Sequence, residues 1–203
     1  MLDKFIAKHL SEPNGISGRV VSFFMNRQNR RIYEKTVEII SIKNGESILD
    51  LGCGNGYVLN MIAQKHKGHF TGIDVSESII ASAKKRNRDY VESGKMQFDC
   101  QNLNKMGFAD CTFDKAYTIN TVYFWESLED SMSEIKRVLN HNGVFYNTLF
   151  SNETLDRFSF TKNGYRKFSQ EQLTKAGTNT GFDVEIVPMF NGLAYCYIYR
   201  KQE

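Results

Sequence analysis

Short apolar runs alternate with amphipathic stretches along most of this chain. Ile48, Leu49 and Leu51 form an apolar run of the kind that a buried parallel strand needs, and apolar residues at helical spacing follow it. Repetition of this pattern predicts a parallel sheet with helices on both of its faces. Strands are expected over residues 48–51, 70–74, 96–99, 113–120, 143–150, 182–189 and 193–199, and helices over 29–42, 57–64, 77–91, 127–139 and 170–179.

The last two predicted strands pair differently from the others. Only Phe190, Asn191 and Gly192 separate them, which is too short for the crossover that parallel neighbours require. They must therefore form an antiparallel hairpin at the end of an otherwise mostly parallel sheet.

Composition and charge narrow the class of protein. Hydrophobic residues make up 41% of the 203 positions, which suits one globular domain with a core of ordinary size. The formal net charge of +3 comes from scattered basic residues, so we expect neither a nucleic-acid nor a membrane partner. We find no bilayer-spanning run and no signal-peptide layout. The cysteines lie far apart without metal-ligand spacing, and we interpret them as reduced thiols of a cytoplasmic protein: Cys53, Cys100, Cys111 and Cys196.

A glycine-rich loop follows the first predicted strand and opens a helix. It reads D-L-G-C-G-N-G over residues 50–56. Alternating glycines let the chain turn tightly and let a ligand approach the backbone, and the helix directs its free N–H groups to the same point. The dinucleotide pattern G-x-G-x-x-G is not matched, because Tyr57 occupies the place of its third glycine, and the phosphate loop ending in G-K-[ST] is absent.

This run, followed by Asp74 at the end of the next strand, resembles the first motif of the class I S-adenosylmethionine-dependent methyltransferases, in particular their small-molecule enzymes of types 11 and 25. The resemblance implies an α/β fold with a single Rossmann-like, doubly wound seven-stranded sheet, mostly parallel with a C-terminal antiparallel hairpin. It also implies one methyltransferase domain over residues 1–203, with a helical N-terminal lid (1–45) on an α/β core (46–203). The N-terminal helices can equally serve only to cover the sheet.

The resemblance implies S-adenosyl-L-methionine as the cofactor. In such sheets ligands bind at the carboxyl ends of the strands, so the loops that lead from strand into helix face the site. A carboxylate at Asp74 would accept hydrogen bonds from two ribose hydroxyls, Val75 would pack against the adenine, and Asp99 would receive the adenine amino group. The cofactor-binding residues carried over in this way are Asp50, Gly52, Cys53, Gly54, Asp74, Val75, Asp99, Cys100 and Asn120.

Residues 121–126 are the most suggestive stretch for the substrate. They leave the fourth strand at the active edge and carry three consecutive aromatics, of which Tyr123 is our first candidate for the pocket, with Trp125 and the lid residue Tyr33 beside it. A core role for all three consecutive aromatics is an open alternative. The long connection over residues 150–168 mixes aromatic and basic side chains, which favours a small anionic acceptor.

The reaction implied by the resemblance is in-line methyl transfer to a small-molecule acceptor. Because the donor is already activated, the protein mainly aligns the reactants and excludes water. No histidine stands out as a base: His66, His69 and His141 fall at the opposite edge, and only His9 could reach the site. We therefore assign no catalytic residue, no metal site and no acceptor atom.

Several other functions are disfavoured. The [DNS]-P-P-[YFW] motif of adenine and cytosine-N4 methyltransferases is absent, because the only prolines are Pro13 and Pro188. Glu126 alone is poor support for a cation site. The main alternative is a non-catalytic protein of methyltransferase fold that binds the cofactor or a partner. A second is aminopropyl transfer, which needs an extra acidic residue where this chain is aromatic. The sequence does not predict an oligomeric state.

Overall fold

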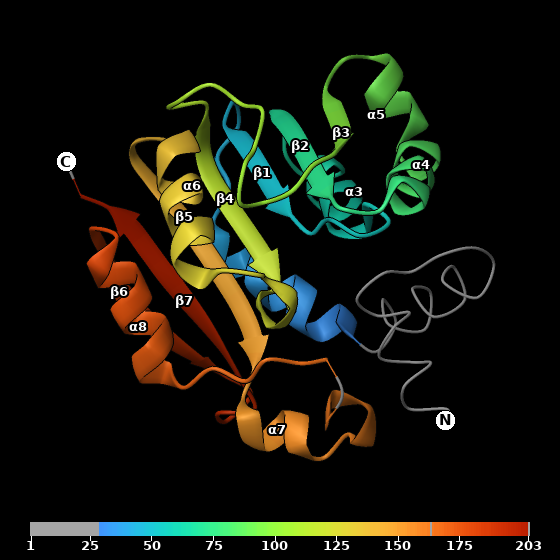
Figure 1. Cartoon of the computed structure of the whole chain (residues 1–203). Helices are drawn as coiled ribbons and strands as arrows, with labels where there is room; N and C mark the ends of the chain where they lie inside the picture. The colour runs from blue at the N-terminus through green and yellow to red at the C-terminus, as the bar shows by residue number, and fades with distance from the viewer. Residues whose placement is uncertain (1–28, 163, 203) are drawn as a thin grey trace.

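The computed structural model describes residues 29–162 and 164–202 and contains a seven-stranded sheet (Figure 1). Its strands lie in the order β3-β2-β1-β4-β5-β7-β6. β7 runs antiparallel to both of its neighbours, and the other pairs are parallel, so the prediction of a mostly parallel sheet ending in an antiparallel hairpin is confirmed. The strands are β1 (Ser47–Leu51), β2 (His69–Asp74), β3 (Met96–Cys100), β4 (Phe113–Ile119), β5 (Leu139–Phe150), β6 (Phe182–Met189) and β7 (Ala194–Lys201).

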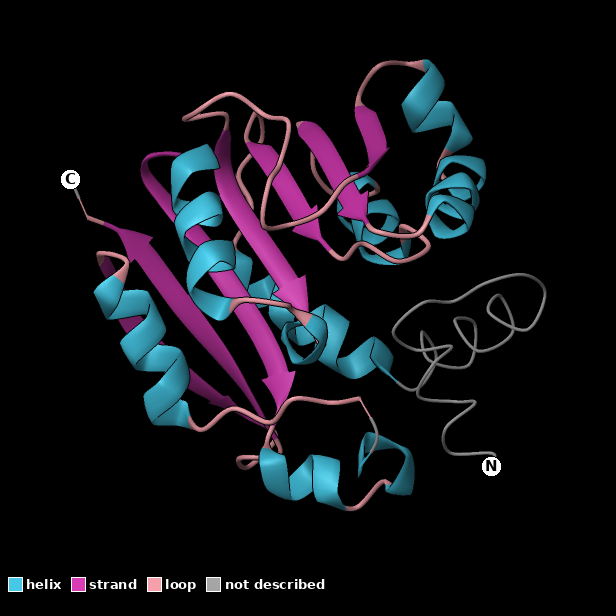
Figure 2. Ribbon diagram, viewed as in Figure 1, coloured by secondary structure: helices cyan, strands magenta, loops and turns pink. Residues whose placement is uncertain are grey.

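Helices cover both faces of the sheet (Figure 2). On one face, α6 (Leu128–Val138) and α8 (Gln170–Asn179) bury their apolar residues in a cluster with Phe145 and Tyr199. On the other face, a helix over residues 29–40, α3 (Tyr57–Ala63) and α4 (Glu77–Arg86) pack in a second cluster with Ile48 and Phe70. Shorter helices are α5 (Arg88–Glu92), η1 (Val122–Phe124), α7 (Asn152–Asp156) and η2 (Ser159–Lys162). No helix in the described residues is long and apolar enough to cross a bilayer.

Two predicted elements differ from the structure by more than two residues. The single helix expected over residues 77–91 is two helices, α4 and α5, that meet at Asn87. The Asn87 side chain is buried and donates hydrogen bonds to the carbonyls of Ala83 and Gly56, so a tertiary contact with the glycine loop ends the first helix. β5 begins at Leu139 rather than at Gly143, because Leu139 already pairs with Phe113 ahead of an irregularity in the register.

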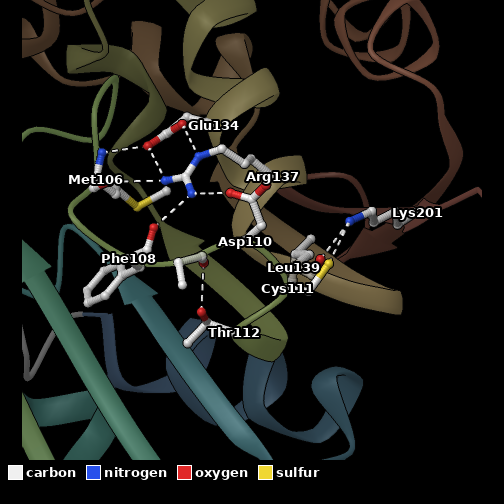
Figure 3. Close-up of polar contacts among 10 residues, drawn as sticks. Met106, Phe108, Asp110, Cys111, Thr112, Glu134, Arg137, Leu139 and Lys201 are labelled. Atoms are coloured by element: carbon white, nitrogen blue, oxygen red, sulfur yellow. Dashed lines mark hydrogen bonds and ion pairs between the residues drawn. The ribbon is translucent and has the colours of Figure 1, made fainter.

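The loop between β3 and β4 is held by one arginine of α6 (Figure 3). Arg137 donates hydrogen bonds to the carbonyls of Met106 and Phe108, and it forms ion pairs with Asp110 and Glu134. Glu134 in turn accepts a hydrogen bond of 2.6 Å from the Met106 N–H. This network fixes a loop whose first residues reach the cavity described below.

Asn147 on β5 is expected to cost the fold stability. It is 1% exposed, and neither amide atom has a hydrogen-bond partner at normal geometry. The Tyr199 hydroxyl lies near the Asn147 amide but is directed to the Leu173 carbonyl, to which it donates. Replacing Asn147 with leucine should raise the free energy of unfolding, measured by urea titration, by about 1–3 kcal/mol. The matched change Asn87→Leu, which removes a buried amide that is hydrogen-bonded, should lower it. A stability loss in both variants would contradict this expectation.

Candidate active site

A cavity of about 570 Å³ lies at the carboxyl edge of the parallel strands. The connections that leave the carboxyl ends of all five parallel strands, β1 to β5, contribute to its lining. The last of them, residues 150–168, includes α7, which Figure 1 shows beyond the ends of β4 and β5. The lining residues from these connections include Gly52 to Gly54, Asp74, Val75, Gln101, Leu103, Asn120 to Thr121, Tyr123 to Trp125, Phe150, Leu155, Phe158, Thr161 and Tyr165.

The glycine loop is tied to the end of β2 by its backbone. The N–H groups of Gly52 and Cys53 both donate to the Ile73 carbonyl at 2.9 Å. The next glycine, Gly54, donates its N–H to the Asp74 carboxylate at 3.1 Å. At Gly54 an added Cβ would meet nothing within 4 Å, so the loop leaves open space at this point for a ligand.

Asp74 closes β2 and lines the cavity. One carboxylate oxygen accepts the Gly54 N–H and the other accepts the Ser76 N–H, each at 3.1 Å. Burial raises the pKa of this carboxyl, and the backbone hydrogen bonds oppose that rise. Because each oxygen has further lone pairs, the carboxylate is held in one orientation and can still accept two donors from a ligand.

Asp50 and Tyr117 form a buried pair beside the glycine loop. They are register partners on β1 and β4, and the Tyr117 hydroxyl donates a hydrogen bond of 2.7 Å to Asp50. Burial raises the pKa of Asp50 to about 7, although the hydrogen bond from Tyr117 acts in the opposite direction. Tyr117 was not predicted as a site residue, because β4 also carries Asp114, Lys115 and Thr118 and its sequence does not single out one polar group.

The Asp50 carboxyl should make stability depend on pH. Its folded-state pKa lies above its ordinary value of 3.8, so the native state binds the extra proton and stability falls as pH rises through about 7. Relative to Asp50→Asn, the wild-type protein should therefore lose unfolding free energy between pH 5 and 7, with a slope approaching about 1.4 kcal/mol per pH unit. Denaturant titrations at several pH values measure this difference. If the difference in unfolding free energy between the two proteins does not change from pH 5 to 7, the pKa of Asp50 is not raised.

The structure gathers most of the predicted cofactor-binding residues around this cavity. Asp50, Gly52, Cys53, Gly54, Asp74, Val75 and Asn120 all contribute to its lining. Asp99 and Cys100 do not line the cavity. After β3, the residues that line it are Gln101 and Leu103. The exposed Cys100 thiol donates to the Val75 carbonyl at 3.3 Å.

The predicted substrate residues also line the cavity, and two of them are largely buried. The Tyr123 hydroxyl accepts the Phe150 N–H at 2.8 Å, and the Tyr123 ring lies 5.3 Å from that of Tyr165. Trp125 donates its indole N–H to the Thr121 hydroxyl and stacks on Phe145. The structure therefore gives these aromatics both a packing role and a face toward the cavity, while Tyr33 reaches the cavity from the helix over residues 29–40.

Neither a histidine nor a metal cluster marks this cavity in the described part of the chain. His66, His69 and His141 are absent from its lining, and His9 lies outside the described residues. Residues 29–162 and 164–202 contain no group of three histidine, cysteine or acidic side chains that could hold a metal ion.

Comparison with known proteins agrees with this geometry. Residues 49–147, from β1 to β5, match the family described as a methyltransferase domain. Over these residues the chain is similar to the methyltransferases. The match covers the glycine loop, Asp74 and the aromatic stretch after β4, but not the long connection after β5.

By their names, two relatives of this chain methylate different kinds of atom, carbon in one and oxygen in the other. A 24-methylenesterol C-methyltransferase from Arabidopsis thaliana is 37% identical over 116 residues, 57% of this chain and 32% of the relative. An O-methyltransferase from Aspergillus nomiae is 34% identical over 109 residues, 54% of this chain and 48% of the relative. The aligned regions thus span about a third and about half of these relatives' lengths.

One solved structure matches the fold over nearly its full length. It is a chain of the complex between the Haloferax volcanii Trm112 methyltransferase activator and a methyltransferase, with a TM-score of 0.80, 16% identity, and 99% of both chains covered. Geranyl diphosphate C-methyltransferase from Streptomyces coelicolor A3(2) gives a TM-score of 0.73 at 12% identity, covering 96% of this chain and 89% of the other. At such identities the likeness shows the fold.

Proposed function

We propose that this protein is an S-adenosylmethionine-dependent methyltransferase that acts on a small-molecule acceptor. The observation that carries the proposal is the Asp74 carboxylate, which two backbone N–H groups orient at the rim of a cavity of about 570 Å³. A carboxylate fixed in this way beside a glycine loop suits the adjacent hydroxyls of a ribose.

Other groups around the cavity fit the remainder of S-adenosylmethionine. The Asn120 side-chain nitrogen is buried without a hydrogen-bond partner, so an acceptor such as the cofactor's carboxylate would satisfy it. Asp50, in its ionised form, would balance the positive charge of the cofactor's amino group. We carry over Asp99 and Cys100 as contacts with less support, since neither lines the cavity.

When bound, the cofactor supplies a methyl group that its sulfonium already activates. The chain's own task is then to align the acceptor and to exclude water, and alignment alone can lower the barrier by roughly 7–11 kcal/mol. The aromatic side chains Tyr123, Phe124 and Trp125 wall the cavity and serve both purposes.

Calorimetric titration of the purified protein with S-adenosylmethionine and S-adenosylhomocysteine tests the proposal. We expect micromolar dissociation constants, corresponding to about 8 kcal/mol of binding free energy. Absence of binding to the native protein would overturn the proposal and favour the alternative, a non-catalytic protein of methyltransferase fold that acts through a partner.

The proposal extends to organisation and location. We propose one domain over residues 1–203 whose first 45 residues help to cover the cofactor. Asn29 and Tyr33 in the cavity lining support this part, and residues 1–28 lie outside the described residues. We also propose a cytoplasmic protein, since all four cysteines are free thiols. The formal net charge of only +3 supports the proposal that it has no nucleic-acid or membrane partner.

A further inference from the structure

The charged residues that line the cavity are all acidic in the described part of the chain. They are Asp50 and Asp74, and no lysine, arginine or histidine joins them. Both carboxyls lie beside the glycine loop, at the end of the cavity that we assign to the cofactor. The opposite end, toward η1, α7 and η2, is lined by uncharged side chains.

The basic residues of the 150–168 connection, which favoured an anionic acceptor in the sequence analysis, are directed elsewhere. Arg166 donates hydrogen bonds to the carbonyls of Trp125 and Glu126, and its guanidinium stacks over the Phe168 ring at 5.2 Å. Lys167 forms an ion pair with Asp156. Arg157 and Lys162 are exposed and do not line the cavity. The structure therefore gives an anionic acceptor no counter-charge from this connection.

The wall of this end is aromatic and aliphatic. Tyr165 lies 4.7 Å from the Phe124 ring and 5.3 Å from the Tyr123 ring, so three rings form a continuous surface. Leu155 and Phe158 extend the surface through α7 toward η2. The Thr161 hydroxyl at this end is already satisfied, because it donates to the Leu155 and Phe158 carbonyls.

Physical chemistry assigns an occupant to such a surface. An ionised carboxylate or phosphate moved from water to this wall would lose its hydration and gain no opposite charge from the described residues, which is strongly unfavourable. It would also lie in the field of two acidic side chains. An apolar molecule gains free energy in proportion to the apolar surface that it removes from water there.

We propose that the methyl acceptor is an uncharged, largely apolar molecule that rests against Tyr123, Phe124, Leu155, Phe158 and Tyr165. The inference rests on the proposed function, since it takes the glycine-loop end of the cavity as the cofactor's place. It replaces the anionic acceptor that the composition of the 150–168 connection favoured.

Three probes with one skeleton test the charge preference: 2-naphthylmethanol, 2-naphthoate and 2-naphthylmethylamine. Each is titrated calorimetrically into the protein saturated with S-adenosylhomocysteine, which carries no sulfonium charge. We expect the alcohol to bind at least tenfold more tightly than the carboxylate and no more weakly than the amine. Equal or tighter binding of the carboxylate, tenfold tighter binding of the amine, or no binding of the alcohol would overturn the inference.

Two substitutions to lysine test whether the preference for the alcohol over the carboxylate arises at this wall of the cavity. Phe158 lines the cavity and is 45% exposed, so Phe158→Lys adds a cation to the wall with little risk to folding. It should reduce the preference for the alcohol over the carboxylate at least fivefold. Phe190, 38% exposed and outside the lining, provides the control Phe190→Lys of equal charge, which should leave the preference unchanged. Equal shifts in both variants would overturn the inference.

The same titrations separate this inference from the proposed function. If S-adenosylhomocysteine does not bind, the proposed function fails, and the three probes are then titrated into the protein alone. A tenfold preference for the alcohol that Phe158→Lys reduces would still establish an apolar ligand site in this cavity. Loss of that preference with S-adenosylhomocysteine bound would remove the inference and leave the methyltransferase proposal intact.

Discussion

Replacing Asp74 with asparagine is expected to weaken S-adenosylhomocysteine binding about ten- to hundredfold, because hydrogen bonds to a charged group contribute about 1.5–3 kcal/mol each. Two effects add in the same direction. The asparagine amide nitrogen would face a backbone N–H of Gly54 or Ser76, which now donates to a carboxylate oxygen. The asparagine side chain would also have only one acceptor oxygen, whereas two ribose hydroxyls need two acceptor oxygens.

Calorimetry of the Asp74→Asn protein measures this loss, and Asp89→Asn is the matched control. Asp89 is an exposed residue on α5, and its substitution removes the same charge at a place away from the cavity. The Asp89→Asn protein should therefore bind S-adenosylhomocysteine with the affinity of the wild type. Urea unfolding of both variants verifies that the fold is retained. An unchanged affinity in the folded Asp74→Asn protein would mean that this carboxylate does not hold the cofactor.

The second large effect is expected at the end of the glycine loop. Gly56 has a φ of +69°, and a Cβ at this position would lie 2.5 Å from the Asn87 amide nitrogen and 2.8 Å from the Phe98 ring. Both of these side chains are 1% exposed, so neither can move into solvent. Gly56→Ala should lower the free energy of unfolding by about 2–5 kcal/mol, from the left-handed backbone conformation together with overpacking.

Gly94→Ala separates the two contributions to this loss. Gly94 has a nearly equal φ of +71°, but a Cβ there would meet nothing within 4 Å. Its substitution should cost only the backbone contribution, about 1–2 kcal/mol. Urea titration of the two variants measures the difference, and equal losses would show that the contacts of Gly56 with Asn87 and Phe98 are not tightly packed.

The strands, and the edge of the sheet that carries the site, were predictable from the sequence because they depend on local patterns. The apolar run of Ile48, Leu49 and Leu51 is buried, and the four-residue connection between β6 and β7 leaves an antiparallel hairpin as the only possible pairing. Once the order of strands and helices is known, the loops at the carboxyl edge follow, since every parallel strand ends there. The placement of Gly54 and Asp74 beside one another was accessible in this way.

Other features depended on contacts between distant segments. Asn87 ends α4 because its side chain reaches the Gly56 carbonyl, which no pattern within residues 77–91 can indicate. Tyr117 joins Asp50 because the register of β1 with β4 makes them partners. Register and side-chain direction are set by packing across the sheet rather than by neighbours along the chain.

Contacts between distant segments also determine which side chains line the acceptor site, and therefore whether that site is charged or apolar. Local composition shows that residues 150–168 combine aromatic and basic side chains, and it shows that they follow a strand at the active edge. It does not show which way each side chain points. The fold turns Arg166 toward the carbonyls after η1 and Lys167 toward Asp156, so that the aromatic side chains are left to line the cavity. Partners supplied by distant segments thus determine a charge pattern that composition alone leaves open.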